Sequence, residues 1–318
     1  MTPPPTRGAR AALAILTLLN LLNYLDRYVL ASLFESLKAS ELRLTDTQLG
    51  SLFTAFLLVY MLASPFFGRL GDRASRPRLL AAGVAAWSLA TALGGFARSF
   101  AGLFASRAAV GIGEAAYATI APALLADSFA KERRGRVFAI FFAAIPVGSA
   151  LGYVLGGLMD RHFGWRAAFF VAGGPGLLLA LLCLAIRDPP RGARDGAALL
   201  PAGPGGAREA YARLFANRPY RTTVAGYAAY TFALGGLAAW TPAFLERVRG
   251  LPKADATVQF GAIVVATGLI GTFAGGWIGD RLLKNDRQAY LKLSGWTTLA
   301  AVPAAVVAFF APGRVLPI

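Results

Sequence analysis

An acidic and a basic residue lie side by side inside the first long apolar run of this sequence. The run covers about residues 11–34, and Asp26 and Arg27 sit a few residues past its centre. A charge at the centre of a bilayer costs about 2.5–3.5 kcal/mol on insertion scales, so these side chains are expected to face a protein interior or a wet cavity. A helix that ended at Tyr24 would leave them in water instead, but residues 28–34 are again mostly apolar.

A second pair of charges lies in the run at residues 102–126. Arg107, Gly111 and Glu114 occupy positions i, i+4 and i+7, so one helical face presents a cation, a gap and a carboxylate. Arg107 could instead extend to the membrane surface, whereas Glu114 lies too deep in the run to do so. The formal charges of the two pairs sum to zero, which lets four charged groups coexist at low dielectric.

These residue types can combine proton exchange with anion binding. Burial disfavours a charged carboxyl group and a neighbouring cation favours it, so its protonation can change as a cavity wets and closes. A guanidinium can hold a phosphate through two parallel hydrogen bonds. Protonating Asp26 would add one positive charge to the group and favour a phosphate-bearing ligand beside Arg107. Asp26 is the preferred proton carrier and Glu114 is the rival.

The composition indicates a membrane protein. The chain has 318 residues, of which 56% are hydrophobic and 15% charged, with a mean hydropathy of +0.55. Its net charge of +16 is spread over short clusters between apolar runs, which argues for membrane topology and against nucleic-acid binding. Cys183 and His162 are alone, so neither a disulfide nor a metal centre is expected. Because no phosphate-binding loop or catalytic triad appears either, the sequence predicts no cofactor and no enzyme.

Nine apolar runs are long enough to cross a membrane, and together they predict an all-α membrane protein. They cover about residues 11–34, 49–70, 79–97, 102–126, 137–159, 167–186, 222–245, 258–278 and 290–311. The loops on the side of the N-terminus carry most of the basic residues, which predicts a cytoplasmic N-terminus.

The glycines at positions 148, 152 and 156 should give the fifth helix a smooth face. Matching glycines at positions 268, 271 and 275 lie in the eighth.

An internal repeat divides the chain into two halves. The segment Gly68-Arg-Leu-Gly-Asp72-Arg73 follows the second run, and Gly276-Trp-Ile-Gly-Asp280-Arg281 follows the eighth. Residues 187–219, rich in Gly, Pro, Ala and Arg, separate the halves. We therefore expect a six-helix bundle over residues 1–186, a cytoplasmic linker over 187–219, and three helices of a second bundle over 220–318.

The motifs resemble those of a transporter family. The segment from Gly68 to Arg78 is similar to the signature between helices 2 and 3 of the major facilitator superfamily, although a plain basic loop would also set topology. More specific segments resemble the spinster family: Asn23-Tyr-Leu-Asp-Arg27, Gly111-Ile-Gly-Glu-Ala115, Pro146-Val-Gly-Ser-Ala-Leu-Gly-Tyr153, Gly226-Tyr-Ala-Ala-Tyr230 and Trp240-Thr-Pro242. The resemblance implies two pseudo-symmetric helical bundles and a carrier of lysophospholipids or sphingosine-1-phosphate, with protons implicated in coupling.

Roles for individual residues follow from this resemblance. In the facilitator fold, helices 1 and 4 line one central cavity, which would bring the four charges together. We expect proton coupling at Asp26 and Glu114. Substrate binding is expected at Arg27, Arg107, Glu114, Tyr227 and Tyr230, although the two tyrosines could equally be packing residues. Gating is expected at Gly68, Asp72, Arg73, Arg76, Asp280 and Arg281.

The chain departs from the family pattern after about nine of twelve helices, which suggests a fragment. Asp72 would then lack its partner on helix 11, while Asp280 could still meet the start of the fifth helix near Arg136. Two other functions stay open: an organic-anion or sugar-acid proton symporter of the same superfamily, and a membrane scaffold that transports nothing. The expected partners are a lipid-like substrate, protons and the bilayer of a bacterial inner or plasma membrane, with the chain as a monomer.

Overall fold

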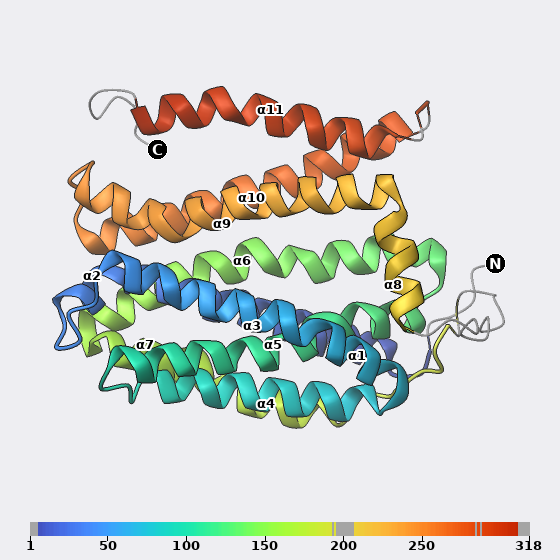
Figure 1. Ribbon diagram of the computed structural model, residues 1–318, viewed down its shortest axis with the longest axis horizontal. Helices are drawn as coiled ribbons and strands as arrows, with labels where there is room; N and C mark the ends of the chain where they lie inside the picture. Colours follow the sequence, from blue (N-terminus) through green and yellow to red (C-terminus); the bar gives the residue numbers. More distant parts are fainter. Residues whose placement is uncertain (1–5, 193, 195–206, 284, 287, 311–318) are drawn as a thin grey trace.

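The computed structural model is built of helices that lie lengthwise beside one another (Figure 1). It describes residues 6–192, 194, 207–283, 285–286 and 288–310. The first helices are α1 (Ala9–Ser32), α2 (Phe34–Ala39), α3 (Asp46–Arg73), α4 (Arg76–Gly94), α5 (Phe100–Ser128), α6 (Lys131–Phe163) and α7 (Trp165–Cys183). They are followed by α8 (Ala207–Ala216), α9 (Arg218–Arg247), α10 (Lys253–Leu283) and α11 (Ala289–Phe310).

The nine expected spans correspond to the nine long helices, with ends that differ by a few residues. Within the described residues, eight helices are long and apolar enough to cross a membrane. The ninth, α4, has 19 residues but opens with Arg76, Pro77 and Arg78, and so falls outside that set. The short helices α2 and α8 were not predicted. α2 continues the first run beyond Leu33, and α8 lies in the segment that was read as a linker without apolar periodicity.

Successive long helices run in opposite directions and define two ends of the bundle. We call the end that holds the start of α1, the end of α7 and the start of α9 the linker face. We call the opposite end, where α1 and α9 finish, the far face (Figure 1). We call α1 to α7 the first group of helices. α6 belongs to this group and packs against α1 on one side and against α10 on the other, so it joins α10 to the first group.

The glycine stripe of α6 packs against α1, and not against the matching glycines noted in the eighth span, which is α10. A Cβ added at Gly152 would lie 2.5 Å from the backbone oxygen of Leu25, so the close approach of the two helices requires glycine there. On α10, Gly268 meets Pro146, but the described surroundings of Gly271 and Gly275 leave open space. The two stripes therefore do not pair, because a stripe on α6 can face only one neighbour at a time.

Two apolar clusters fill the first group of helices, one toward each end. The cluster toward the linker face includes Leu16, Trp87 and Leu124, all fully buried. The cluster toward the far face includes Leu33 and Phe169. Asp26, Arg107 and Glu114 are buried near the middle of the bundle, where the two clusters meet.

Candidate functional site

The four charged residues form two separate ion pairs. Asp26 pairs with Arg107, with Oδ1 and Nη2 3.3 Å apart, and Arg27 pairs with Glu114, with Nη2 and Oε2 2.7 Å apart. Consecutive residues of an α-helix point about 100° apart, so the side chains of Asp26 and Arg27 leave α1 toward different neighbours. The four charged side chains of α1 and α5 do lie near one another, as expected, but they form two ion pairs and not one cluster.

The Asp26–Arg107 pair is sealed inside the first group of helices. Only 1% of Asp26 and 3% of Arg107 is exposed, so Arg107 does not extend to the membrane surface. The hydroxyl of Thr91 on α4 donates to Asp26 Oδ2 over 2.5 Å and accepts from Arg107 Nη2 over 3.1 Å. Thr91 thus links the two charges. The sequence analysis missed it, because a single threonine in an apolar helix carries almost no signal.

The Arg27–Glu114 pair is partly open. The side chain of Arg27 is 21% exposed, whereas that of Glu114, on α5, is fully buried. Arg27 Nε and Nη2 both donate to Glu114 Oε2, over 2.8 and 2.7 Å, so one carboxylate oxygen receives both contacts. The other oxygen, Oε1, has no hydrogen-bond partner within the described structure. The side chain of Asn23 lies beside this carboxylate, and its amide nitrogen is buried.

Three aromatic rings surround the Arg27 guanidinium. Its Cζ atom lies 5.1 Å from the ring centroid of Tyr24, 5.0 Å from that of Phe56 and 5.3 Å from that of Tyr60. Such contacts stabilise a cation that has lost part of its water. The result is an arginine held in one orientation by rings and a carboxylate, with part of its surface still accessible.

The two tyrosines expected on the seventh span lie on α9. Tyr227 is 71% exposed, Tyr230 is also exposed, and Tyr227 lies within electrostatic range of Tyr60 on α3. Neither tyrosine packs into either apolar cluster. The structure therefore leaves both rings accessible.

The expected gating residues on the linker face have different surroundings. Arg76 is buried between Asp127 and Asp188: its Nη1 lies 2.6 Å from Asp127 Oδ2 and its Nε lies 2.6 Å from Asp188 Oδ1. Arg191 closes this network by donating to the backbone oxygen of Gly71 over 2.9 Å. All these partners belong to the first group of helices and the chain just after it, and the sequence analysis missed Asp127 and Asp188.

The remaining gating residues are more exposed. Asp72 and Arg73 are exposed at the end of α3, and Gly68 is partly buried nearby. Arg281 is exposed with its Cζ 4.9 Å from the ring centroid of Trp277. The side chain of Asp280 lies outside the described residues, and so does any contact between it and α6.

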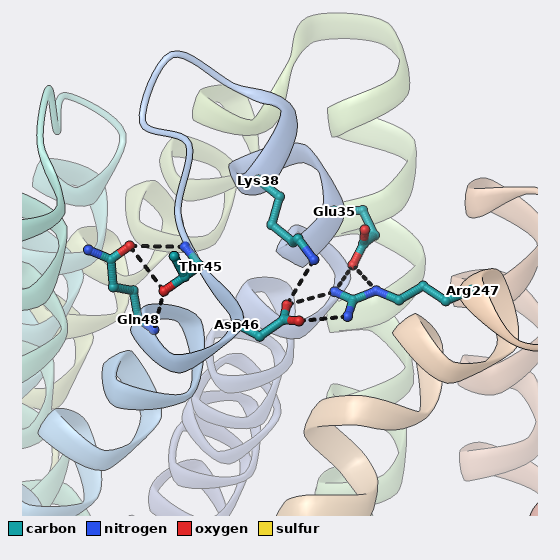
Figure 2. A network of polar contacts seen from close by, with 6 residues as sticks. All are labelled: Glu35, Lys38, Thr45, Asp46, Gln48 and Arg247. Carbon is teal, nitrogen blue, oxygen red and sulfur yellow. Dashed lines mark hydrogen bonds and ion pairs between the residues drawn. The ribbon is translucent and has the colours of Figure 1, made fainter.

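A polar network closes the far face between the two parts of the chain (Figure 2). The guanidinium of Arg247 holds Asp46 through two parallel contacts, Nη1 to Oδ2 and Nη2 to Oδ1, each 2.9 Å long. Its Nε also donates to Glu35 Oε1 over 2.8 Å. Lys38 donates to Asp46 Oδ1 over 3.0 Å. We call Glu35, Lys38, Asp46 and Arg247 the latch.

Local structure positions the latch residues. Thr45 and Gln48 form a reciprocal cap at the start of α3, which fixes Asp46 in the first turn (Figure 2). Arg247 is the last residue of α9. Below the latch, the rings of Phe34 and Trp240 pack edge to face with centroids 5.0 Å apart. The sequence analysis did not single out Arg247, because its partners lie about two hundred residues away in the chain.

Comparisons with known proteins show the family to which this chain belongs. The chain matches the Major Facilitator Superfamily over residues 16–316. It is 35% identical to protein spinster of Drosophila melanogaster, across 88% of this chain and 47% of that protein. It is 37% identical to human spinster homolog 1, across 84% of this chain and 53% of that protein. The chain thus spans about half the length of the curated relatives it matches.

A solved structure is also similar. It is described as a bacterial homolog of the human lysosomal transporter spinster, in an inward-facing and unoccupied conformation. It aligns with a TM-score of 0.80 and 28% identity, across 98% of this chain and 71% of the other. The structure of the same kind of homolog in an inward-facing, occupied conformation aligns with a TM-score of 0.75.

Proposed function

The chain belongs to the major facilitator superfamily, with spinster proteins among its relatives, and from this premise we propose that the intact protein is a secondary transporter that works by alternating access. Its proposed substrate is a lysolipid-like amphipathic molecule with an anionic or zwitterionic headgroup, and its transport is coupled to protons. The observation that carries the proposal is that two ion pairs connect α1 and α5 inside the bundle. The Asp26–Arg107 pair is sealed, and the Arg27–Glu114 pair is partly open. A scaffold has no use for charges buried at this depth.

Substrate binding is proposed at the partly open pair. A phosphate can compete with Glu114 for Arg27, because the guanidinium is accessible and its aromatic surroundings already hold it in place. The unpaired Glu114 Oε1 is suited to accept a hydrogen bond from an amine or hydroxyl of the headgroup. Tyr227 and Tyr230 are proposed to contact the substrate from α9.

Proton coupling is proposed at the sealed pair, with Glu114 as the rival carrier. A proton on Asp26 removes the negative charge that holds Arg107, and it leaves a net positive charge in the interior. Arg107 then becomes available to attract a phosphate, which is how a residue so deeply buried can contribute to substrate binding. Proton and substrate binding are thereby linked through one local change of charge.

The conformation is proposed to be inward-open. The latch joins the two parts of the chain at the far face, whereas Arg76 and its partners at the linker face lie within one part. A cytoplasmic N-terminus places the linker face in the cytoplasm, as the distribution of basic residues favours. We further propose that residues 1–186 and 220–318 rock against each other, joined by residues 187–219, in a monomer of the bacterial inner or plasma membrane.

Binding and transport by the full-length protein test the proposal. Reconstituted protein should accumulate a fluorescent lysolipid when a pH gradient is imposed. The Arg107→Ala variant should bind lysolipid far more weakly than wild type and an uncharged detergent about equally well. Equal loss for both ligands would argue against a headgroup site. Uptake of a sugar acid instead of lysolipid would favour the alternative symporter.

A further inference from the structure

α8 (Ala207–Ala216) has a different orientation from the long helices. In Figure 1 it runs nearly at right angles to them, across the linker face, and it leads directly into α9. Because the long helices cross the bilayer, a helix perpendicular to them at their ends lies along the membrane surface.

The described polar and large apolar side chains of α8 lie on two faces. Tyr211, Leu214 and Phe215 lie within one third of the helix circumference, because residues three and four apart in a helix are neighbours. They are 49%, 42% and 59% exposed. Glu209 and Arg213 lie on the opposite side, where they form an ion pair with each other. The helix is thus amphipathic, with Tyr211, Leu214 and Phe215 exposed on one side.

A defined joint connects α8 to α9. The side chain of Asn217 accepts a hydrogen bond from the backbone of Tyr220 over 3.3 Å and caps α9, whose first turn contains Pro219. The rings of Phe215 and Tyr220 lie 6.2 Å apart and are nearly perpendicular. The apolar face of α8 is therefore continuous with the start of a helix that enters the bilayer.

Exposed cations accompany this apolar face. Arg218 and Arg221 lie in the first turn of α9, and both are exposed beside the joint. An amphipathic helix of this kind binds at the boundary between headgroups and acyl chains, and nearby arginines are attracted by anionic lipids.

We propose that α8 is a membrane-surface anchor with a preference for anionic lipids. Tyr211, Leu214 and Phe215 insert at the boundary with the acyl chains, Glu209 and Arg213 face water, and Arg218 and Arg221 bind lipid headgroups. Because the joint at Asn217 is ordered, the anchor also holds the start of α9 at a constant depth. The continuity of the apolar surface with α9 identifies a lipid surface as the occupant.

Spin labels can measure the depth of each face. Cys183 is the only cysteine, so Cys183→Ser provides the background for Leu214→Cys and Arg213→Cys. The labelled chains are reconstituted in nanodiscs of phosphatidylcholine, with or without phosphatidylglycerol. The label at position 214 should be more accessible to oxygen than to a water-soluble nickel chelate, and the label at position 213 should show the reverse. The depth at position 214 should increase when phosphatidylglycerol is present.

Two outcomes would overturn the anchor. Equal accessibility of both positions to the nickel chelate would place α8 in water. Protection of position 214 from both oxygen and nickel would show that protein covers this face. An insertion depth that is the same with and without phosphatidylglycerol would overturn the preference for anionic lipids. Helix content and elution volume equal to those of the Cys183→Ser background exclude misfolding as the cause.

Discussion

Asp26 and Arg27 are consecutive residues of α1, yet each is bound to a different partner on α5, Asp26 to Arg107 and Arg27 to Glu114. This arrangement separates the two tasks of the proposed transporter within one helix. In that proposal a proton on Asp26 acts on the sealed pair directly and reaches Glu114 only through space. The following predictions test this separation and the packing that supports it.

Replacing Asp26 with asparagine should abolish accumulation of lysolipid driven by a pH gradient, because the residue can no longer bind and release a proton. Exchange of lysolipid without a gradient should persist. The measurement is uptake by proteoliposomes that contain the full-length protein, with and without an imposed gradient. Glu114→Gln is the matched comparison, and full accumulation by Asp26→Asn would transfer the proton role to another residue.

The Thr91→Val variant should be less stable than wild type by about 1–3 kcal/mol, the usual cost of leaving a buried polar partner unsatisfied. The substitution keeps the shape of the side chain but removes the hydroxyl that joins Asp26 to Arg107. Thermal unfolding in detergent measures the change. Thr91→Ser retains the hydroxyl and should lose less stability. Equal effects of the two substitutions would show that packing, and not the hydrogen bonds, explains the loss.

Arg27→Lys should weaken lysolipid binding about as strongly as Arg27→Ala, although it preserves the charge. A lysine ammonium cannot make two contacts in a fixed plane and stack among three rings as this guanidinium does. Titration calorimetry with the full-length protein measures the affinity. Tyr24→Phe is the control, because it removes a hydroxyl and keeps the ring beside Arg27. Wild-type affinity in the lysine variant would contradict the proposed geometry.

Removing the arginine of the latch should open the far face. Arg247→Gln loses the contacts with Glu35 and Asp46, so the distance between spin labels at positions 47 and 248 should become longer and more broadly distributed. High salt should shift the wild type in the same direction, since the latch side chains are partly exposed and their charges are screened.

Arg249→Gln is the control for the latch. Arg249 lies near Arg247, but its Cζ lies 5.5 Å from the ring centroid of Phe244 and its Nη2 donates to Ala308, both in the second part of the chain. Loss of this cation should leave the label distance unchanged. A similar opening in both variants would attribute the effect to general destabilisation of this end of the bundle.

The Gly152→Ala variant should be destabilised by about 1–3 kcal/mol, the usual cost of overpacking. The added methyl group would approach the backbone oxygen of Leu25 to 2.5 Å and push α6 away from α1. Gly135→Ala is the matched control in the same helix, where a Cβ meets nothing within 4 Å and alanine favours the helix. Thermal unfolding compares the two, and an unchanged midpoint in Gly152→Ala would contradict the close contact.

Local sequence patterns were sufficient for the helices but not for their partners. Apolar runs predicted the nine long helices because each run must bury its length in hydrocarbon, whatever its neighbours are. The glycine stripe around Gly152 predicted a close contact, yet the stripe alone could not say whether α1 or α10 makes it. α8 was overlooked because Tyr211, Leu214 and Phe215 form too short a pattern to stand out in a segment rich in Gly and Arg.

The sequence by itself indicated that Asp26, Arg27 and Glu114 face the interior of a helical bundle, since residue type and depth in an apolar run set the cost of exposing a charge to lipid. It left open whether Arg107 is buried or extends to the membrane surface. Only the tertiary structure decided how these charges pair, that Thr91 joins Asp26 to Arg107, and that Arg247 holds Asp46 across the far face. The physical reason is that an ion pair depends on which helix faces lie within a few ångströms, and those faces are set by packing between segments far apart in the chain.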